Sequence, residues 1–267
     1  MNLIGLHGNV PRRTLGGYFD YSRYICRPCE FNGAIADNVY LVAGDPLIEL
    51  QANAIATLAN TQIPGTNAWV EIIDWISDLV GLCEADFDVV FLDTNPSFSI
   101  YTQMALSASD RLVVPVMADD SSRRAIQNVF SLVYGLQLPS PIYSQHAFAT
   151  KLTQAERELP KVHLLARNRI TQYMGEASAY AAVLRSIDDI ISRLLEENPN
   201  LFTFERLEDG IVSIRDFQTT GVVAFAEGLP FSKLNSGSHD IVGRVIEVRN
   251  DYITHCRGAV SQLVNRL

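Results

Sequence analysis

The chain has 267 residues, of which 48% are hydrophobic and 19% charged, and its formal net charge is −9. This composition excludes disordered, collagen-like and disulfide-dense proteins, and the length is ample for a sizeable hydrophobic core. The acidic balance argues against a protein permanently coated with nucleic acid, which needs clustered basic residues. Arginine dominates the basic residues, because the only lysines are Lys151, Lys161 and Lys233.

Two further features bear on where the protein works. No apolar run approaches the roughly 18 residues of a membrane span, and no secretory signal is present at the N-terminus, so we expect a cytoplasmic protein. Cys26 and Cys29 form a C-x-x-C pair, a spacing used by zinc sites and dithiol redox motifs. No second pair and no paired histidines lie nearby, so we interpret them as reduced cysteines in a loop.

The first half of the chain predicts two strands and a helix. Residues 1–38 are expected to be irregular, because glycine and proline are scattered through them. A strand is predicted over 39–42, and a helix over 68–83, where apolar residues recur at helical spacing. An apolar strand over 89–92 follows and ends at Asp93.

The second half alternates in the same way. A strand is predicted over 112–116, and Asp119 and the residue after it are typical of a helix N-terminus. Another strand over 162–165 leads towards Asn168 and a long amphipathic helix, and residues 236–267 are expected to be a closing helical segment. Apolar strands alternating with helices predict one α/β domain over residues 1–267, with a mostly parallel sheet covered by helices on both faces.

Ligands of open α/β sheets bind at the carboxyl ends of the strands, which directs attention to Asp93, Asp119 and Asn168. Four apolar residues followed by Asp have the shape of a Walker B strand, whose carboxylate holds Mg²⁺ or its water beside a phosphate. Taken alone, the pattern is weak, because many α/β strands end in an Asp that serves as a turn residue or helix cap.

The residues around Asp93 carry a more specific signal. Residues 88–97 read DVVFLDTNPS, residues 104–110 read MALSASD, and residues 112–116 read LVVPV. This succession resembles the Walker B strand, switch segment and following strand of the ParA/MinD-type (Soj-like) partitioning P-loop ATPases. The resemblance is dense over 86–135, looser elsewhere, and extends over roughly residues 1–235.

The resemblance implies a role for each matching position. Asp93 would be the catalytic Walker B carboxylate and the Mg²⁺ ligand through a water molecule. The other implied nucleotide-binding residues are Thr94, Pro96 and Ser97 in the switch, Pro115 and Asp119 beside the base, and Asn168 and Arg169 at the adenine. Asn95 replaces the first of the family's two prolines. ATP and Mg²⁺ as cofactors, ATP-dependent homodimerisation, nonspecific DNA binding at the nucleoid and a ParB-like centromere-binding partner are implied as well.

The family's P-loop is missing from this sequence. A glycine-rich turn ending in Lys and Ser/Thr should follow the first strand, where its backbone N–H groups hold the phosphates. The glycines at 5–8 and 16–17 have no lysine beside them, and the first lysine is Lys151. We therefore expect a chain that begins about 40 residues late, without the first strand and the P-loop. Such a chain should bind ATP weakly and expose the centre of its sheet.

Two functions stay open, and with them the question of whether the chain is an enzyme. One is a ParA-like ATPase of chromosome or plasmid partitioning, and the other is an inactive, truncated homologue that regulates by binding a partner. A hydrolase is disfavoured by the absence of a G-x-S-x-G motif, and His163 is interpreted as a core histidine. The arginines expected on the last helix form no single stripe that would support a DNA-binding face: Arg244, Arg249, Arg257 and Arg266.

Overall fold

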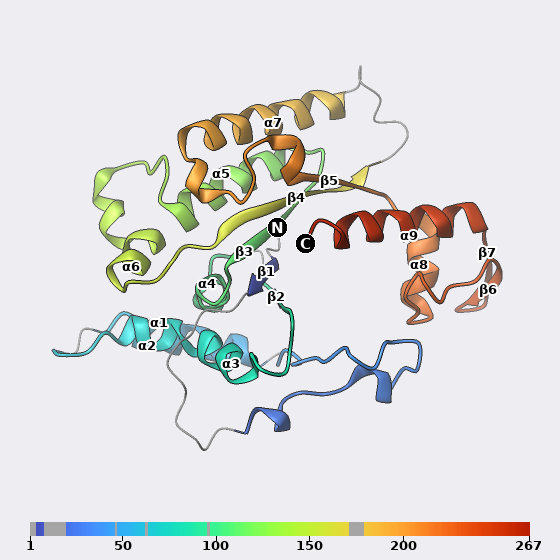
Figure 1. Ribbon diagram of the computed structural model, residues 1–267, viewed down its shortest axis with the longest axis horizontal. Helices are drawn as coiled ribbons and strands as arrows, with labels where there is room; N and C mark the ends of the chain where they lie inside the picture. The colour runs from blue at the N-terminus through green and yellow to red at the C-terminus, as the bar shows by residue number, and fades with distance from the viewer. Residues whose placement is uncertain (1–3, 8–19, 46, 62–63, 95–96, 171–178) are drawn as a thin grey trace.

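The computed structural model describes residues 4–7, 20–45, 47–61, 64–94, 97–170 and 179–267. Within these ranges the chain forms an α/β fold around a five-stranded sheet of order β2-β1-β3-β4-β5, with a separate β6–β7 hairpin (Figure 1). The strands are β1 (Ile4–His7), β2 (Val90–Asp93), β3 (Arg111–Val116), β4 (Lys161–Ile170), β5 (Ile211–Arg215), β6 (Gly237–Ile241) and β7 (Arg244–Val248). The helices are α1 (Ile48–Ala59), α2 (Ala68–Ile73), α3 (Trp75–Cys83), α4 (Ile100–Ser107), α5 (Asp120–Tyr134), α6 (Phe148–Gln154), α7 (Ala179–Glu197), α8 (Gln218–Ala226) and α9 (Asn250–Val264).

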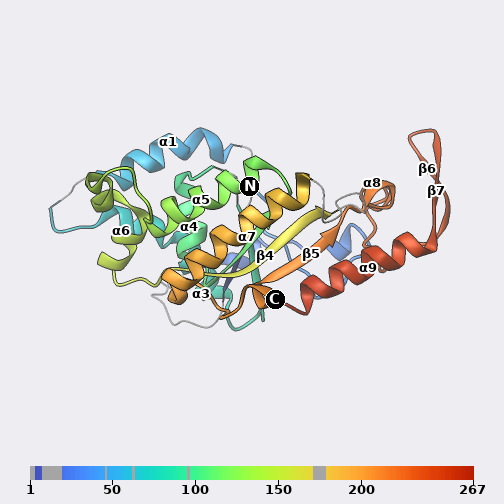
Figure 2. The same cartoon turned by 90° about the horizontal axis from the view of Figure 1, so that it is seen from above.

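The strands β3, β4 and β5 are parallel and form the buried part of the sheet, which confirms the predicted fold class. Alternate residues of β3 enter different clusters on the two faces of the sheet. Leu112 and Val114 pack with α5 and α7, whereas Val113 packs with β4, β5 and the end of α9. Figure 2 shows α5 and α7 side by side over β4. The continuous apolar runs are thus explained by burial on both faces.

The centre of the sheet is filled by β1, contrary to the expectation that it would be exposed. Ile4 pairs with both Asp93 of β2 and Val113 of β3, and both pairings are antiparallel. β2 and β3 are therefore parallel to each other with one strand position between them. The backbone N–H and C=O groups that line this position need hydrogen-bond partners, and β1 supplies them in the direction opposite to that of its neighbours.

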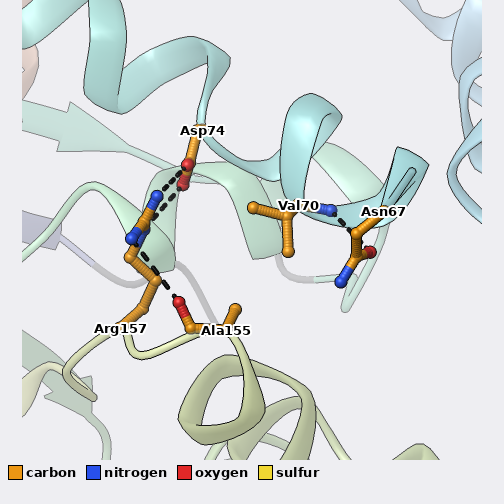
Figure 3. A network of polar contacts seen from close by, with 5 residues as sticks. All are labelled: Asn67, Val70, Asp74, Ala155 and Arg157. Carbon is orange, nitrogen blue, oxygen red and sulfur yellow. Dashed lines mark hydrogen bonds and ion pairs between the residues drawn. The ribbon is translucent and has the colours of Figure 1, made fainter. Parts of the chain in front are cut away.

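The helix predicted over 68–83 divides at Asp74 into α2 and α3. Asp74 is the C-cap of α2 and the N-cap of α3, and its carboxylate contacts the guanidinium of Arg157 at 2.6 and 3.3 Å. The guanidinium also donates a hydrogen bond to the carbonyl of Ala155 (Figure 3). Asn67 caps the start of α2, because its side chain accepts a hydrogen bond from the N–H of Val70. The break therefore lies where the chain is bound to the segment after α6.

The predicted strand 39–42 is absent, because this segment makes one isolated antiparallel bridge, between Leu41 and Cys26. Its four side chains are 43–50% exposed although all are apolar. Cys26 and Cys29 are free and half-buried, and the Sγ of Cys26 donates to the carbonyl of Leu41.

The closing segment is a hairpin followed by a helix, and the expectation of a wholly helical segment over 236–267 is wrong. The hairpin turns at Val242 and Gly243, whose φ angles are +53° and +75°, the combination of a type I′ turn. It packs on α8 and α9 around a small cluster of its own, formed by Val223, Ala224, Leu234, Val248 and Ile253.

Two histidines stabilise the C-terminal part of the chain, one within it and one between it and β4. The Nδ1 of His239 lies 2.7 Å from the Glu227 carboxylate and its Nε2 lies 3.0 Å from a main-chain carbonyl, so both ring nitrogens face acceptors. The ring of His163 bridges Thr203 and the carbonyl of Arg266, which ties β4 to the end of the chain. His163 is thus a half-buried histidine with both ring nitrogens bonded.

The four C-terminal arginines are on different elements. Arg244 is on β7, Arg249 precedes α9 and pairs with Asp251, and Arg257 and Arg266 donate to main-chain carbonyls of neighbouring loops. Two of them therefore act as internal ties. No helix in the described ranges is long and apolar enough to cross a membrane.

Candidate functional site

The residues predicted to bind nucleotide lie along the edge where the parallel strands end. Asp93 is the last residue of β2, Pro115 is near the end of β3, and Asn168 is near the end of β4. Asp93 is exposed and the following Thr94 is buried. The carboxyl edge of the sheet thus collects most of the candidate set, as α/β topology requires.

The strand register divides this set into two groups. Asp93 is level with Ile4, and Ile4 is level with Val113, so β3 continues three residues beyond the level of Asp93. Three residues of strand span about 10 Å, and the intervening β1 separates β2 from β3 by about 10 Å. Asp93 and Thr94 therefore form one group, and the residues at the ends of β3 and β4 form another. Only an extended ligand would contact both groups.

The switch segment after β2 is described in part. The carbonyl of Ser97 accepts a hydrogen bond from the Thr102 hydroxyl at 2.7 Å, which ties the segment to the first turn of α4. The Ser97 residue itself is exposed. Pro96 and Asn95 lie outside the described residues, so the predicted role of Pro96 has no structural test.

The turn between β3 and α5 is closed by Asp119, as the sequence predicts. Its carboxylate accepts the N–H of Ser122 at 2.7 Å and the hydroxyl of Ser121 at 2.8 Å. The backbone hydrogen bond from Ser122 is the main cause that lowers the pKa of Asp119. A carboxylate held at this helix N-terminus satisfies the first-turn N–H of Ser122 and would repel a phosphate. We therefore place no phosphate at the start of α5.

Asn168 and Arg169 lie at the irregular end of β4, where its pairing with β5 shifts register. Both are exposed, and the side-chain oxygen of Asn168 accepts the N–H of Arg169 at 2.8 Å. Arg169 has a φ of +58°, a strained backbone conformation for a residue with a side chain. The preceding Arg167 points elsewhere, because its guanidinium is paired with Asp188 of α7.

The donor set at this edge suits Mg²⁺ better than it suits ATP. Mg²⁺ commonly takes one or two protein carboxylates and completes its shell with water and phosphate oxygens, and Asp93 presents one exposed carboxylate. No group of three or more His, Cys, Asp or Glu side chains in the described ranges forms a dedicated metal cage. A P-loop would add a lysine to hold the phosphates, but the first lysine in the sequence is Lys151 on α6.

A cavity at the opposite edge was not predicted. It has a volume of about 680 Å³ and lies where β4 begins and α7 ends, with Lys161, Glu196, Phe204 and Arg206 among its lining residues. The irregular segment 199–208 forms much of its wall. No periodic pattern or motif marks that segment, so sequence reasoning had no signal for it.

The sheet, its helical layers and the acidic strand end define the chain as an α/β protein with a P-loop NTPase-like fold. Residues 36–139 match the family model described as "AAA domain", a group of ParA/MinD-like P-loop NTPases. The matched range covers less than half of the chain and includes β2, the switch segment, β3 and α5. Comparisons with curated proteins and with solved structures give no match.

Proposed function

We propose that this chain is a ParA-like partitioning protein of the P-loop ATPase class, which associates with DNA and dimerises in response to ATP. The observation that carries the proposal is the family match over 36–139, because it contains Asp93 and Asp119 at the edge where α/β sheets bind ligands. In this role Asp93 holds Mg²⁺ through water, and Mg²⁺ supplies positive charge to the phosphates when it is bound. Thr94, Pro96 and Ser97 respond to the γ-phosphate.

The other residues of the site recognise the base. The Asn168 amide both donates and accepts in one plane, which suits the edge of adenine, and Arg169, Pro115 and Asp119 border it. A ParB-like protein as partner and the cytoplasm or nucleoid as location follow from the same proposal.

A second function is favoured by two observations around the phosphate position. β1 runs antiparallel between β2 and β3, and no lysine precedes Lys151. A chain with these features fits an inactive homologue that regulates by binding a partner rather than by hydrolysing ATP.

Binding of a fluorescent ATP analogue in the presence of Mg²⁺, together with phosphate release, tests the two functions. For the ATPase we expect saturable binding and turnover, with Asp93→Asn reducing turnover at least tenfold. Asp88→Asn is the matched control, because Asp88 is an exposed carboxylate that precedes β2. Asn168→Ala should reduce the preference for ATP over GTP. Absence of nucleotide binding in the unaltered chain would contradict the ATPase and support the regulator.

A further inference from the structure

Residues 39–42, which we call the strap, are four consecutive apolar residues that lie outside the sheet (Figure 1). Val39 and Tyr40 are each 43% exposed, and Leu41 and Val42 are each 50% exposed. A strand that carries apolar side chains on both faces is typical of the buried interior of a parallel sheet. The strap therefore has the sequence of a central strand but the surroundings of a surface loop.

The outer side of β2 offers an open position for a further strand, and the strap could fill it. Among the residues that the structure describes, β2 is the edge strand of the sheet and pairs on one side only, with β1. Phe91 in β2 is 57% exposed, and Val89, the residue directly before β2, is 54% exposed. Apolar edge strands with unpaired N–H and C=O groups readily accept another strand.

The hydrogen bonds of the strap lie on the side that faces Cys26 and leave the opposite side free. The N–H of Leu41 donates to the carbonyl of Cys26 at 3.0 Å, and the N–H of Cys26 donates to the carbonyl of Leu41 at 2.9 Å. Successive residues of a strand direct their backbone groups to opposite sides. Tyr40 and Val42 therefore face away from Cys26, and in the described part of the chain neither has a backbone hydrogen-bond partner. The strap has one bonded side and one open side.

The strap already lies against the start of β2. The rings of Tyr40 and Phe87 pack edge to face with centroids 5.0 Å apart, and Phe87 is three residues before β2. The strap is connected to β2 through α1, α2 and α3. Neighbouring parallel strands are joined by helical crossovers of this kind, so the connection suits a parallel pair.

We propose that the strap docks on the outer edge of β2 as a sixth, parallel strand, with Tyr40 and Val42 bonding to β2 while Leu41 keeps its bridge to Cys26. The structure shows the strap in its open position. In the docked position the loop 43–45 reaches the same edge as Asp93, so docking adds a wall to the candidate nucleotide site. The docking itself requires no nucleotide.

Hydrogen exchange of the unaltered chain without nucleotide tests this directly. We expect the amides of Tyr40 and Val42 to exchange at least tenfold more slowly than unstructured amides. Val42→Pro should abolish the protection of Tyr40, because it removes an N–H that faces β2. Ala43→Pro is the matched control, since residue 43 faces the Cys26 side, and it should leave Tyr40 protected. Unprotected amides at 40 and 42, or equal loss in both variants, would overturn the proposal.

A cysteine pair identifies the strand that the strap contacts. Paired Cα atoms of adjacent strands lie within the 4.4–6.8 Å that a disulfide spans. We expect Val42→Cys combined with Phe91→Cys or Leu92→Cys to form a disulfide within one chain on mild oxidation, as mapped by mass spectrometry. A disulfide that forms only between two chains would overturn the proposal, because the edge of β2 would then pair with a second copy. Neither experiment depends on ATP binding.

Discussion

Removing the Arg157 guanidinium should destabilise the fold at the junction between α2 and α3. The Arg157 and Asp74 side chains are 30% and 15% exposed and make a two-point contact. Breaking a fully buried ion pair costs about 3–5 kcal/mol, whereas an exposed pair contributes about 0–1 kcal/mol. For this half-buried pair we expect Arg157→Ala to lower the free energy of unfolding by about 2 kcal/mol, because the Asp74 carboxylate loses its partner.

The loss should be visible in thermal and urea denaturation. For a domain of this size, about 2 kcal/mol corresponds to a decrease in Tm of about 4–8 °C. A double-mutant cycle with Asp74→Asn should give a coupling of about 1–2 kcal/mol. Arg157→Lys should lose part of the stability, since an ammonium group does not reproduce the two-point geometry of the guanidinium.

The exposed Arg206–Asp209 pair provides the control for this experiment. It has a similar two-point geometry, but its side chains are 73% and 48% exposed. Arg206→Ala should leave the unfolding midpoint unchanged, because water screens the pair. A coupling near zero between Arg157 and Asp74, or equal effects at the buried and exposed pairs, would refute the reasoning.

Four further predictions concern titration and packing. The carboxylate beside His239 raises its pKa, so the stability from this contact should be full below pH 6.5 and lost as the pH rises through the raised pKa; hairpin hydrogen exchange that does not change with pH would contradict this. Burial lowers the pKa of His163, so its contribution should be full above pH 6.5 and decline as the pH falls below 6.5, and His163→Asn should reduce that dependence in urea titrations. A Cβ at Gly210 would lie 2.2 Å from the ring of Phe204, so Gly210→Ala should lower the free energy of unfolding by about 1–3 kcal/mol. Gly258, within α9, has open space around it, so Gly258→Ala should raise the free energy of unfolding by about 0.5–1 kcal/mol, and urea midpoints would compare the two variants.

The parts of the fold that the sequence predicts well are those with a local cause. The strands β3 and β4 are recognisable because both their faces are buried, which requires uninterrupted apolar residues. Asp119 is recognisable as a helix cap because it satisfies an N–H group three residues away. Each of these signals lies within a few residues of the element it predicts.

The elements that the sequence predicts incorrectly depend on contacts that are distant in sequence or on a turn. The break at Asp74 coincides with a contact to Arg157, 83 residues further on, whereas the apolar spacing of 68–83 by itself suggests one helix. The β6–β7 hairpin has a local signal in Gly243, which suits the second position of a type I′ turn. The signal is weak because Val242 occupies the first position of the turn, where a β-branched residue is seldom found.

The sequence predicts that the candidate residues share one edge of the sheet, but it does not predict their spacing. The rule that ligands bind at strand carboxyl ends places Asp93, Pro115 and Asn168 at the same edge. How far apart they lie depends on the order and register of the strands. β1 enters between β2 and β3, so one strand lies between Asp93 and Pro115, and two strands lie between Asp93 and Asn168.

The strand β2 is where local pattern and tertiary structure differ most. Its own sequence, apolar residues ending in Asp93, predicts the strand correctly, yet both its neighbours are unexpected. On the inner side it pairs with β1 in the antiparallel direction, and on the outer side it presents an apolar edge near the apolar strap, which is bridged to Cys26. Because a parallel strand on either side would carry a loop to the level of Asp93, the partners of β2 determine what that carboxylate can bind. Hydrogen exchange of the strap amides therefore reports on the outer side of β2, whereas nucleotide binding reports on the side next to β1.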